Sequence, residues 1–204
     1  MQNRQACLEM LAREVNNQPE ALRLIARIED SQDLLIRLFD QVREYAAPIR
    51  LHLQRYDVSA ILKEAWQSTG QVRQGRDARL AVNSAGVDLF CDVDRLRLGQ
   101  VFRNILENAL QACSDPVVID VTCSRVNLAG RPALRFAVRN NGPPLTPEEA
   151  RHIFEAFFTT KTHGTGLGMS IVKRIVEAHG GQIAVTQDMT AGMEVLITLP
   201  RTMD

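Results

Sequence analysis

The sequence predicts an α+β fold: one mixed β-sheet covered by helices on one face, a two-layer α/β sandwich, preceded by an α-helical hairpin. Three observations predict this class. Residues 1–56 carry the apolar periodicity of helices, strand and helix patterns after residue 57 come in blocks rather than strict alternation, and a glycine-rich stretch leads directly into an amphipathic helix. We therefore expect two domains, a helical hairpin over residues 1–56 and a globular domain over residues 57–204.

Composition narrows the class further. The 204 residues are 45% hydrophobic and 24% charged with a formal net charge of zero, which is typical of a globular protein and predicts no nucleic-acid surface. No apolar run approaches the roughly 20 residues that span a bilayer, so we expect a cytoplasmic segment without membrane contact, although a longer parent chain could be anchored. The four cysteines form no CxxC pair and are expected to be reduced thiols.

The hairpin is predicted from a heptad pattern. Apolar residues alternate steps of three and four at Ala21, Leu24, Ile28, Leu35, Leu38, Val42 and Tyr45, with Ser31 at the one polar position. A shorter apolar face precedes Pro19, and Pro48 ends the helix or kinks it. Two helices alone cannot bury this row of apolar side chains. We therefore expect a second copy of the hairpin to cover it, which predicts a homodimer.

The globular domain is expected to begin with a helix over residues 58–71, two short strands over 80–83 and 88–91, and a strong helix over 96–112. Strands over 117–126 and 134–138 follow, joined by a turn at Ala129-Gly130. A short helix follows an irregular stretch marked by Pro143, Pro144 and Pro147. A further helix ends at Gly180, and a last strand pair covers 181–187 and 193–199.

Three glycines fall within five residues, at Gly164, Gly166 and Gly168, directly before a helix. Glycines expose successive backbone N–H groups, and the helix that follows directs its unpaired N–H groups and its positive end the same way. Together these features favour phosphate binding. A glycine-rich hinge without a ligand is the alternative, and neither a Walker loop nor a dinucleotide fingerprint fits.

Two further groups of residues carry chemistry. Asn104 and Asn108 share one face of the predicted helix with Glu107 at its edge, and an amide oxygen with phosphate oxygens would suit Mg²⁺. The alternative is two hydrogen-bonded asparagines on a solvated face. The stretch from Val138 to Lys161 holds Asn140-Asn141-Gly142, several phenylalanines and a lysine near the glycines, which suits polyphosphate. There the alternative is a loop pinned by its phenylalanines, with the lysine merely solvated.

The order and spacing of these groups resemble the ATP-binding catalytic domain of sensor histidine kinases, in the nitrogen-regulator-like branch, with the Bergerat-type ATP-binding fold. The matching pieces are the N box at Asn104 to Asn108, the G1 box at Asn140 to Gly142, the F box at Phe154 to Lys161, the G2 box at Gly164 to Gly168, and the closing strand at Ile197 to Pro200. The resemblance covers roughly residues 57–201, and more loosely the hairpin.

The resemblance implies ATP and Mg²⁺ as cofactors, with ATP between the long helices and a lid over residues 145–164. Asn108 would bind Mg²⁺, Asn104 would face the phosphates, and Glu107 would polarise water or the metal's ligands. Asn140 would meet the adenine amino group, Gly142 would let the backbone come close, and Thr198 would line the adenine pocket. The phosphates would be held by Lys161, which joins Asn104 and Glu107 in the catalytic set, and by Gly164, Thr165, Gly166, Leu167 and Gly168.

The implied reaction is in-line transfer of the ATP γ-phosphate to a histidine on the hairpin, which makes a phosphoprotein, and then to an aspartate of a response regulator receiver domain. Positioning and charge neutralisation would carry most of the catalysis. The implied partners are ATP, the receiver domain and a second copy of the chain.

The sequence departs from the family's pattern in three places. Asn140 stands where the family usually has Asp, which weakens an adenine hydrogen bond by an order of 1 kcal/mol. Pro144 replaces a usual glycine and stiffens the lid entrance. The phosphoacceptor is missing from the first helix, because the chain's histidines are His52, His152, His163 and His179. We therefore expect a fragment of a longer kinase that does not autophosphorylate by itself.

Two other functions fit less well. A kinase-like regulator without catalysis would act only by binding partners through the hairpin. Another ATPase of the same superfold, such as a gyrase-like enzyme or an anti-sigma serine kinase, is disfavoured by the Phe-Phe-Thr-Thr-Lys run and by the hairpin.

Overall fold

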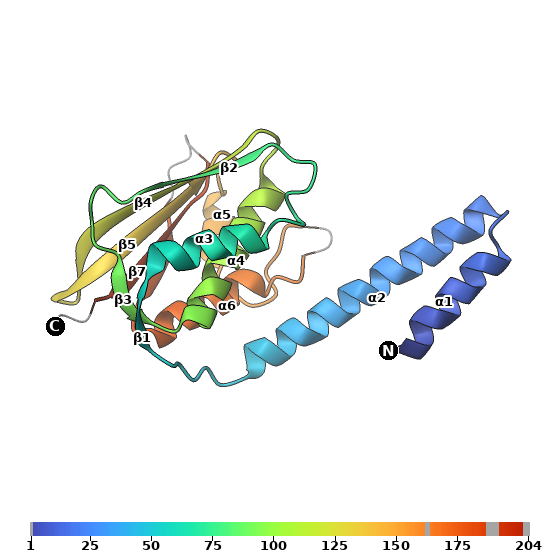
Figure 1. Cartoon of the computed structure of the whole chain (residues 1–204), viewed down its shortest axis with the longest axis horizontal. Helices are drawn as coiled ribbons and strands as arrows, with labels where there is room; N and C mark the ends of the chain where they lie inside the picture. Colours follow the sequence, from blue (N-terminus) through green and yellow to red (C-terminus); the bar gives the residue numbers. More distant parts are fainter. Residues whose placement is uncertain (1, 162–163, 187–191, 202–204) are drawn as a thin grey trace. The chain divides into compact units, whose positions relative to one another are not determined.

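The computed structural model describes residues 2–161, 164–186 and 192–201 and shows two compact units (Figure 1). The first unit runs to Ala47 and includes Lys161, and the second begins at Pro48 and includes the other described residues. The junction therefore lies before the expected residue 57. The reason is a strand that sequence reasoning did not identify, β1 (Gln54–Asp57), which pairs with β3 (Phe90–Val93) of the second unit.

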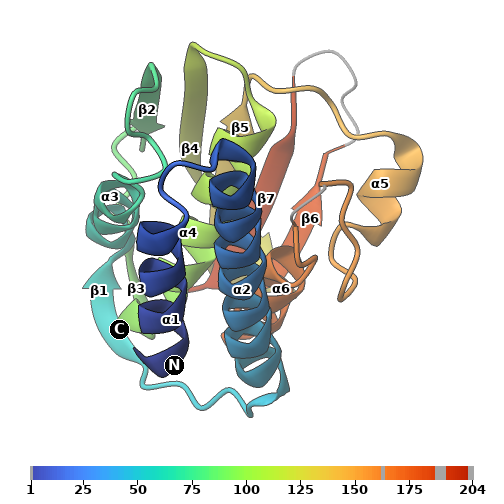
Figure 2. The ribbon, with the colours of Figure 1, turned by 90° about the vertical axis from the view of Figure 1, so that its right-hand side faces the viewer.

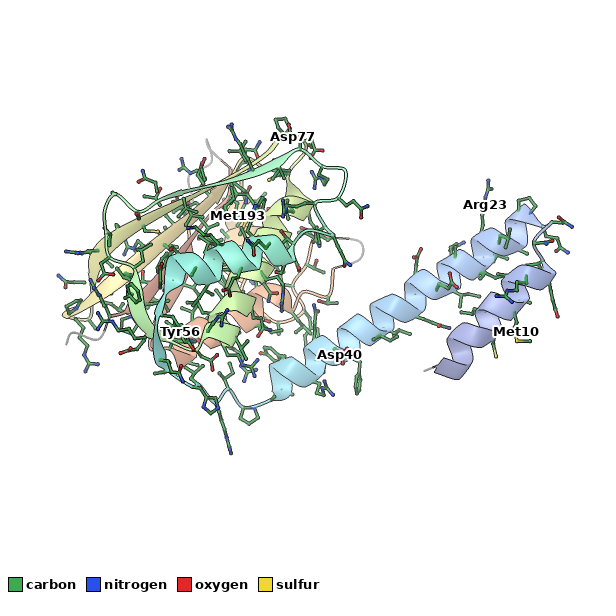
Figure 3. All side chains as sticks on the ribbon, in the orientation of Figure 1. Met10, Arg23, Asp40, Tyr56, Asp77 and Met193 are labelled. Atoms are coloured by element: carbon green, nitrogen blue, oxygen red, sulfur yellow. The ribbon has the colours of Figure 1, made fainter. Side chains whose placement is uncertain are left out.

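The first unit is the expected helical hairpin. Helix α1 covers Gln2–Glu14 and helix α2 covers Pro19–Ala46, with Pro19 in the first turn of α2, where a missing N–H is tolerated. Side chains project from both helices, among them the labelled Met10, Arg23 and Asp40 (Figure 3). Much of the predicted heptad stripe is exposed within this chain, including Leu24, Ile28, Leu35 and Val42, and the neighbouring Phe39 is exposed as well.

The second unit is built on a mixed five-stranded sheet in the order β2-β4-β5-β7-β6. Its strands are β2 (Ala78–Asn83), β4 (Val117–Leu128), β5 (Arg131–Asn140), β6 (Gln182–Val185) and β7 (Glu194–Pro200). Only β2 and β4 run parallel, and the other neighbours are antiparallel. The predicted turn between β4 and β5 is confirmed, because Ala129 and Gly130 both take positive φ angles, of 50° and 80°, as a two-residue type I′ turn requires.

Helices α3 (Val58–Ser68), α4 (Arg95–Ala112) and α6 (Gly168–Ala178) cover one face of this sheet (Figure 2). Short helix α5 (Pro147–His152) begins with a capping box between Thr146 and Glu149. The core lies between the sheet and the three long helices, where the apolar residues predicted to point inward from α4 are buried: Leu98, Val101, Ile105, Leu106, Ala109 and Leu110. The expected α+β class, with helices on one face of a mixed sheet, is confirmed.

Both ends of α4 are held by side chains, which fixes the helix that carries the asparagines. At its start the Asp94 carboxylate accepts the Arg97 N–H at 3.0 Å, as an N-cap. At its end the Arg76 guanidinium donates to the carbonyl of Leu110 and, at 2.8 Å, to that of Cys113. Arg76 also pairs with Asp115 at 2.6 Å. The helix is therefore anchored where its own backbone groups lack partners.

Candidate functional site

Helix α4 displays the predicted asparagine group. Its inward stripe packs against the sheet, and Asn104, Glu107 and Asn108 are half-buried beside that stripe. Burial raises the pKa of Glu107, and the nearby Arg103 charge opposes this rise only in part. A glutamate with a raised pKa beside two amides is suited to holding a proton or orienting water.

A hydrogen bond connects this group to the glycine-rich loop. The Nδ2 of Asn104 donates to the carbonyl oxygen of Gly168 at 3.2 Å, across 64 positions of sequence. Gly168 is the first residue of α6, so the asparagine face of α4 and the N-terminus of α6 meet. The structure thus brings together two of the segments that sequence analysis singled out.

The loop before α6 is held by a close backbone approach. Gly166 has a φ of +70°, and a Cβ added there would lie 2.4 Å from the carbonyl carbon of Phe157. The Phe157 N–H in turn donates to the Gly166 carbonyl at 3.0 Å. Leu167 is fully buried and anchors the loop in the core, as its apolar character predicts. Only glycine fits at position 166, both for its backbone angle and for its space.

The start of α6 offers unpaired N–H groups. Its first backbone hydrogen bond runs from Ile171 to Leu167 at 2.9 Å, and no side chain of the described residues caps the helix. Gly168 faces open space, since an added Cβ there would meet no described heavy atom within 4 Å. Gly164 and Thr165 precede this helix and are half-buried. This combination fits an anionic group such as a phosphate.

The turn after β5 lies at the other end of α4. Asn140 is buried at the end of β5, and its N–H donates to the Met193 carbonyl at 3.0 Å. The Oδ1 of Asn140 accepts the Gly142 N–H at 2.9 Å and lies 3.4 Å from the Sγ of Cys113, the C-cap residue of α4. A Cβ at Gly142 would approach that sulfur to 2.9 Å, so glycine is needed for this close packing.

Thr198 does not join this group in the structure. Thr198 lies opposite Arg135 in the β5–β7 ladder, so the two side chains share one face of the sheet. Val138 and Asn140 are an odd number of positions from Arg135 on β5 and therefore face the other side. The Thr198 hydroxyl accepts a hydrogen bond from the Nε of Arg135 at 3.4 Å. The assignment of Thr198 to the adenine pocket is therefore wrong. Lys161 belongs to the first unit, so its position relative to the glycine loop stays a prediction.

Sequence reasoning missed two residues that shape the group. Cys113 contacts Asn140, although its position at the end of α4 carried no motif. A Cβ at Gly192 would lie 2.0 Å from the Asn140 carbonyl oxygen, so this glycine is needed for β7 to reach β5. A separate cavity of about 350 Å³, lined in part by Lys63, Val87 and Phe90, contains none of the predicted site residues.

The oxygen donors on α4 suit one kind of metal ion. Among the residues that the structure describes, no cluster of three or more His, Cys, Asp or Glu could hold one. This face of α4 offers the amide oxygens of Asn104 and Asn108 and the carboxylate of Glu107 as ligands. That set fits Mg²⁺, which keeps several waters and takes substrate phosphates as further ligands. Within the described chain, no helix is long and apolar enough to cross a membrane.

Comparisons with known proteins agree with this geometry. Residues 93–203 match the model of the "Histidine kinase-, DNA gyrase B-, and HSP90-like ATPase" family. The sensor histidine kinase ZraS of Escherichia coli K12 is 33% identical over 183 residues, which are 89% of this chain and 38% of ZraS. The histidine kinase/phosphatase NtrB of Rhizobium meliloti is 29% identical over 85% of this chain and 48% of its own length. The chain thus spans less than half of either relative.

Solved structures of histidine kinases are also similar to this chain. The nucleotide-free catalytic domain of the histidine kinase ThkA superimposes with a TM-score of 0.65 and 30% identity, over 74% of this chain and 97% of that one. Full-length ShkA, solved in complex with AMPPNP, gives a TM-score of 0.71 and 27% identity over 92% of this chain and 40% of that one.

Proposed function

Since this chain belongs to the histidine kinase-, DNA gyrase B- and HSP90-like ATPases, as the catalytic domain of a sensor histidine kinase, we propose that it holds Mg-ATP along α4 and transfers the γ-phosphate to a histidine. The histidine would lie on a dimerisation helix, and the phosphoryl group would pass on to an aspartate of a response regulator. One solved relative, ThkA, was crystallised in complex with a response regulator protein.

The observation that carries this proposal is the hydrogen bond between Asn104 and Gly168. It sets the phosphate end of the site, where the asparagine face of α4 meets the open N-terminus of α6. The other end is set by Asn140 against Cys113. Asn104 and Cys113 are nine positions apart on α4, about 13.5 Å at about 1.5 Å per residue. A nucleotide lying along α4 would therefore place its phosphates at the Asn104 end of the site and its base at the Asn140 end.

The chain's own residues have distinct roles in this arrangement. The α6 N–H groups and Lys161 would hold the phosphates, and Asn108 would supply an oxygen ligand to Mg²⁺, which neutralises the phosphate charge when bound. The raised pKa of Glu107 fits it for orienting the incoming imidazole or taking up its proton. The exposed apolar stripe of α2 supports a homodimer, in which a second hairpin covers Leu24, Ile28 and Phe39.

The nucleotide site is tested by calorimetry on Asn108→Ala. We expect ATP binding in Mg²⁺ to weaken about tenfold or more, the size of one lost metal or charged hydrogen-bond contact, and the difference to shrink in EDTA. Asn127→Ala is the matched control, because Asn127 is exposed on β4 away from the group. Equal affinities for Asn108→Ala and the wild type in Mg²⁺ would refute the site.

The transfer step needs a separate assay. A hairpin that carries a histidine acceptor, supplied in trans with radiolabelled ATP, should become phosphorylated by this chain. Binding of ATP without any transfer would instead favour a regulator that acts only through partners.

A further inference from the structure

The side-chain amide of Asn140 has its oxygen occupied, whereas its nitrogen has no hydrogen-bond partner among the residues that the structure describes. Oδ1 accepts the Gly142 N–H at 2.9 Å and lies 3.4 Å from the Cys113 sulfur. Burial raises the pKa of the Cys113 thiol, so this sulfur keeps its proton at neutral pH and can donate it to Oδ1. Both lone pairs of the oxygen are then used within the protein.

The orientation of this amide is fixed by its neighbours. A flipped amide would place Nδ2 2.9 Å from the Gly142 N–H, donor against donor, so the oxygen must face the turn. Nδ2 has no partner among the described residues and is not sealed from solvent. Asn140 therefore offers an N–H donor outward, from a residue that is itself only 6% exposed.

The family resemblance implies that Asn140 meets position 6 of the purine, and that is where this donor matters. Adenine carries an amino donor there, whereas guanine and hypoxanthine carry a carbonyl acceptor. A carboxylate at residue 140 would keep one oxygen on the Gly142 N–H and present the other to an adenine amine. The amide presents Nδ2 instead, which opposes an amino group and matches a carbonyl.

Resting on the proposed nucleotide site, we propose that Asn140 sets its base selectivity, so that the site takes 6-oxopurine nucleoside triphosphates at least as well as ATP. Because Cys113 and Gly142 occupy Oδ1, an asparagine at residue 140 presents a donor to the base, where an aspartate would present an acceptor. With Oδ1 less occupied, the amide oxygen could still have accepted from adenine, and selectivity would have been unchanged.

The test compares three triphosphates that differ at position 6. Calorimetry in Mg²⁺ measures ATP, with a donor there, ITP, with an acceptor, and purine riboside triphosphate, with neither. We expect the wild-type chain to bind ITP at least as tightly as ATP, and purine riboside triphosphate no more weakly than ATP. Asn140→Asp should shift the ratio of ATP to ITP affinity toward ATP by about tenfold or more, the size of one exchanged hydrogen bond.

Asn127→Asp is the matched control, because it adds the same charge at an exposed position of β4 away from the site, so the base ratio should stay that of the wild type. Wild-type binding of ATP threefold or more tighter than ITP would overturn the selectivity proposal and leave the nucleotide site standing. Failure of all three triphosphates to bind would remove the nucleotide site itself, and the selectivity with it.

Discussion

Replacing Gly166 by alanine should damage the loop before α6 for two separable reasons. The backbone at Gly166 has a φ of +70°, which a residue with a Cβ adopts at an expense of about 1–2 kcal/mol. The new Cβ would also lie 2.4 Å from the Phe157 carbonyl carbon, well inside van der Waals contact. Because the obstacle is backbone rather than a flexible side chain, relieving it adds about 1–3 kcal/mol, as other overpacked sites do.

Gly130 separates these two contributions. It has a φ of +80° in the β4–β5 turn, and a Cβ there would meet no described atom within 4 Å. Gly130→Ala should therefore lower the free energy of unfolding by the backbone contribution alone, about 1–2 kcal/mol. Gly166→Ala should lower it by about 2–5 kcal/mol, because the loop is anchored in the core by fully buried Leu167.

Urea denaturation of both variants measures the difference, and calorimetry with ATP measures its functional effect. The Gly166 variant should also lose ATP affinity, because the loop that presents α6 to the phosphates is displaced, whereas the Gly130 variant should bind ATP normally. Losses of stability that agree within about 0.5 kcal/mol, with ATP affinity retained in both, would refute the steric argument.

Two further outcomes follow from contacts at the ends of the helices. Arg76→Ala should lower the free energy of unfolding by about 2–3 kcal/mol, because it removes the hydrogen-bond donor of carbonyls at the end of α4. Arg95→Ala, which breaks an exposed ion pair, should change this free energy by less than about 1 kcal/mol. Equal denaturation midpoints for the two variants would contradict this expectation. His179 is buried with its Nε2 accepting the Asp94 N–H at 3.0 Å, and burial lowers its pKa. Its contribution to stability is therefore complete above pH 6.5 and decreases as the pH falls below that value, by up to about 1.4 kcal/mol per pH unit. His179→Gln should flatten the unfolding free energy between pH 5 and about 6.5, and an unchanged slope would show that another group is responsible.

Much of the fold could be predicted because its signals are local. The helix over 96–112 and the turn at Ala129-Gly130 follow from periodicity and turn chemistry, and both are confirmed. Strand β1 could not be identified, since Gln54–Asp57 is polar and short and owes its conformation to pairing with β3. The last strand pair was predicted with edges that differ by one or more residues, as strand ends depend on their neighbours.

The segments that form the candidate site could be predicted from the sequence, but the orientation of some of their side chains could not. The asparagine pair and the glycine loop were identified from residue types and spacing, and the structure joins them. Thr198 was misplaced although a signal existed, because it alternates with buried Ile197 and Leu199 and so must face away from the helices. The orientation of the Asn140 amide depends on Cys113, 27 positions away, and no local pattern could reveal it.

The long β4–β5 hairpin connects the proposed purine end of the site to a distant turn. Asn140 is the last of ten paired residues, roughly 30 Å from Ala129-Gly130 at about 3.4 Å per residue. Side chains alternate between faces, so a slip of one position would send Asn140 to the solvent side and put Arg139 or Asn141 in its place. An insertion or deletion in that tip, far from the proposed nucleotide site, would thus exchange the atoms that are proposed to read the base.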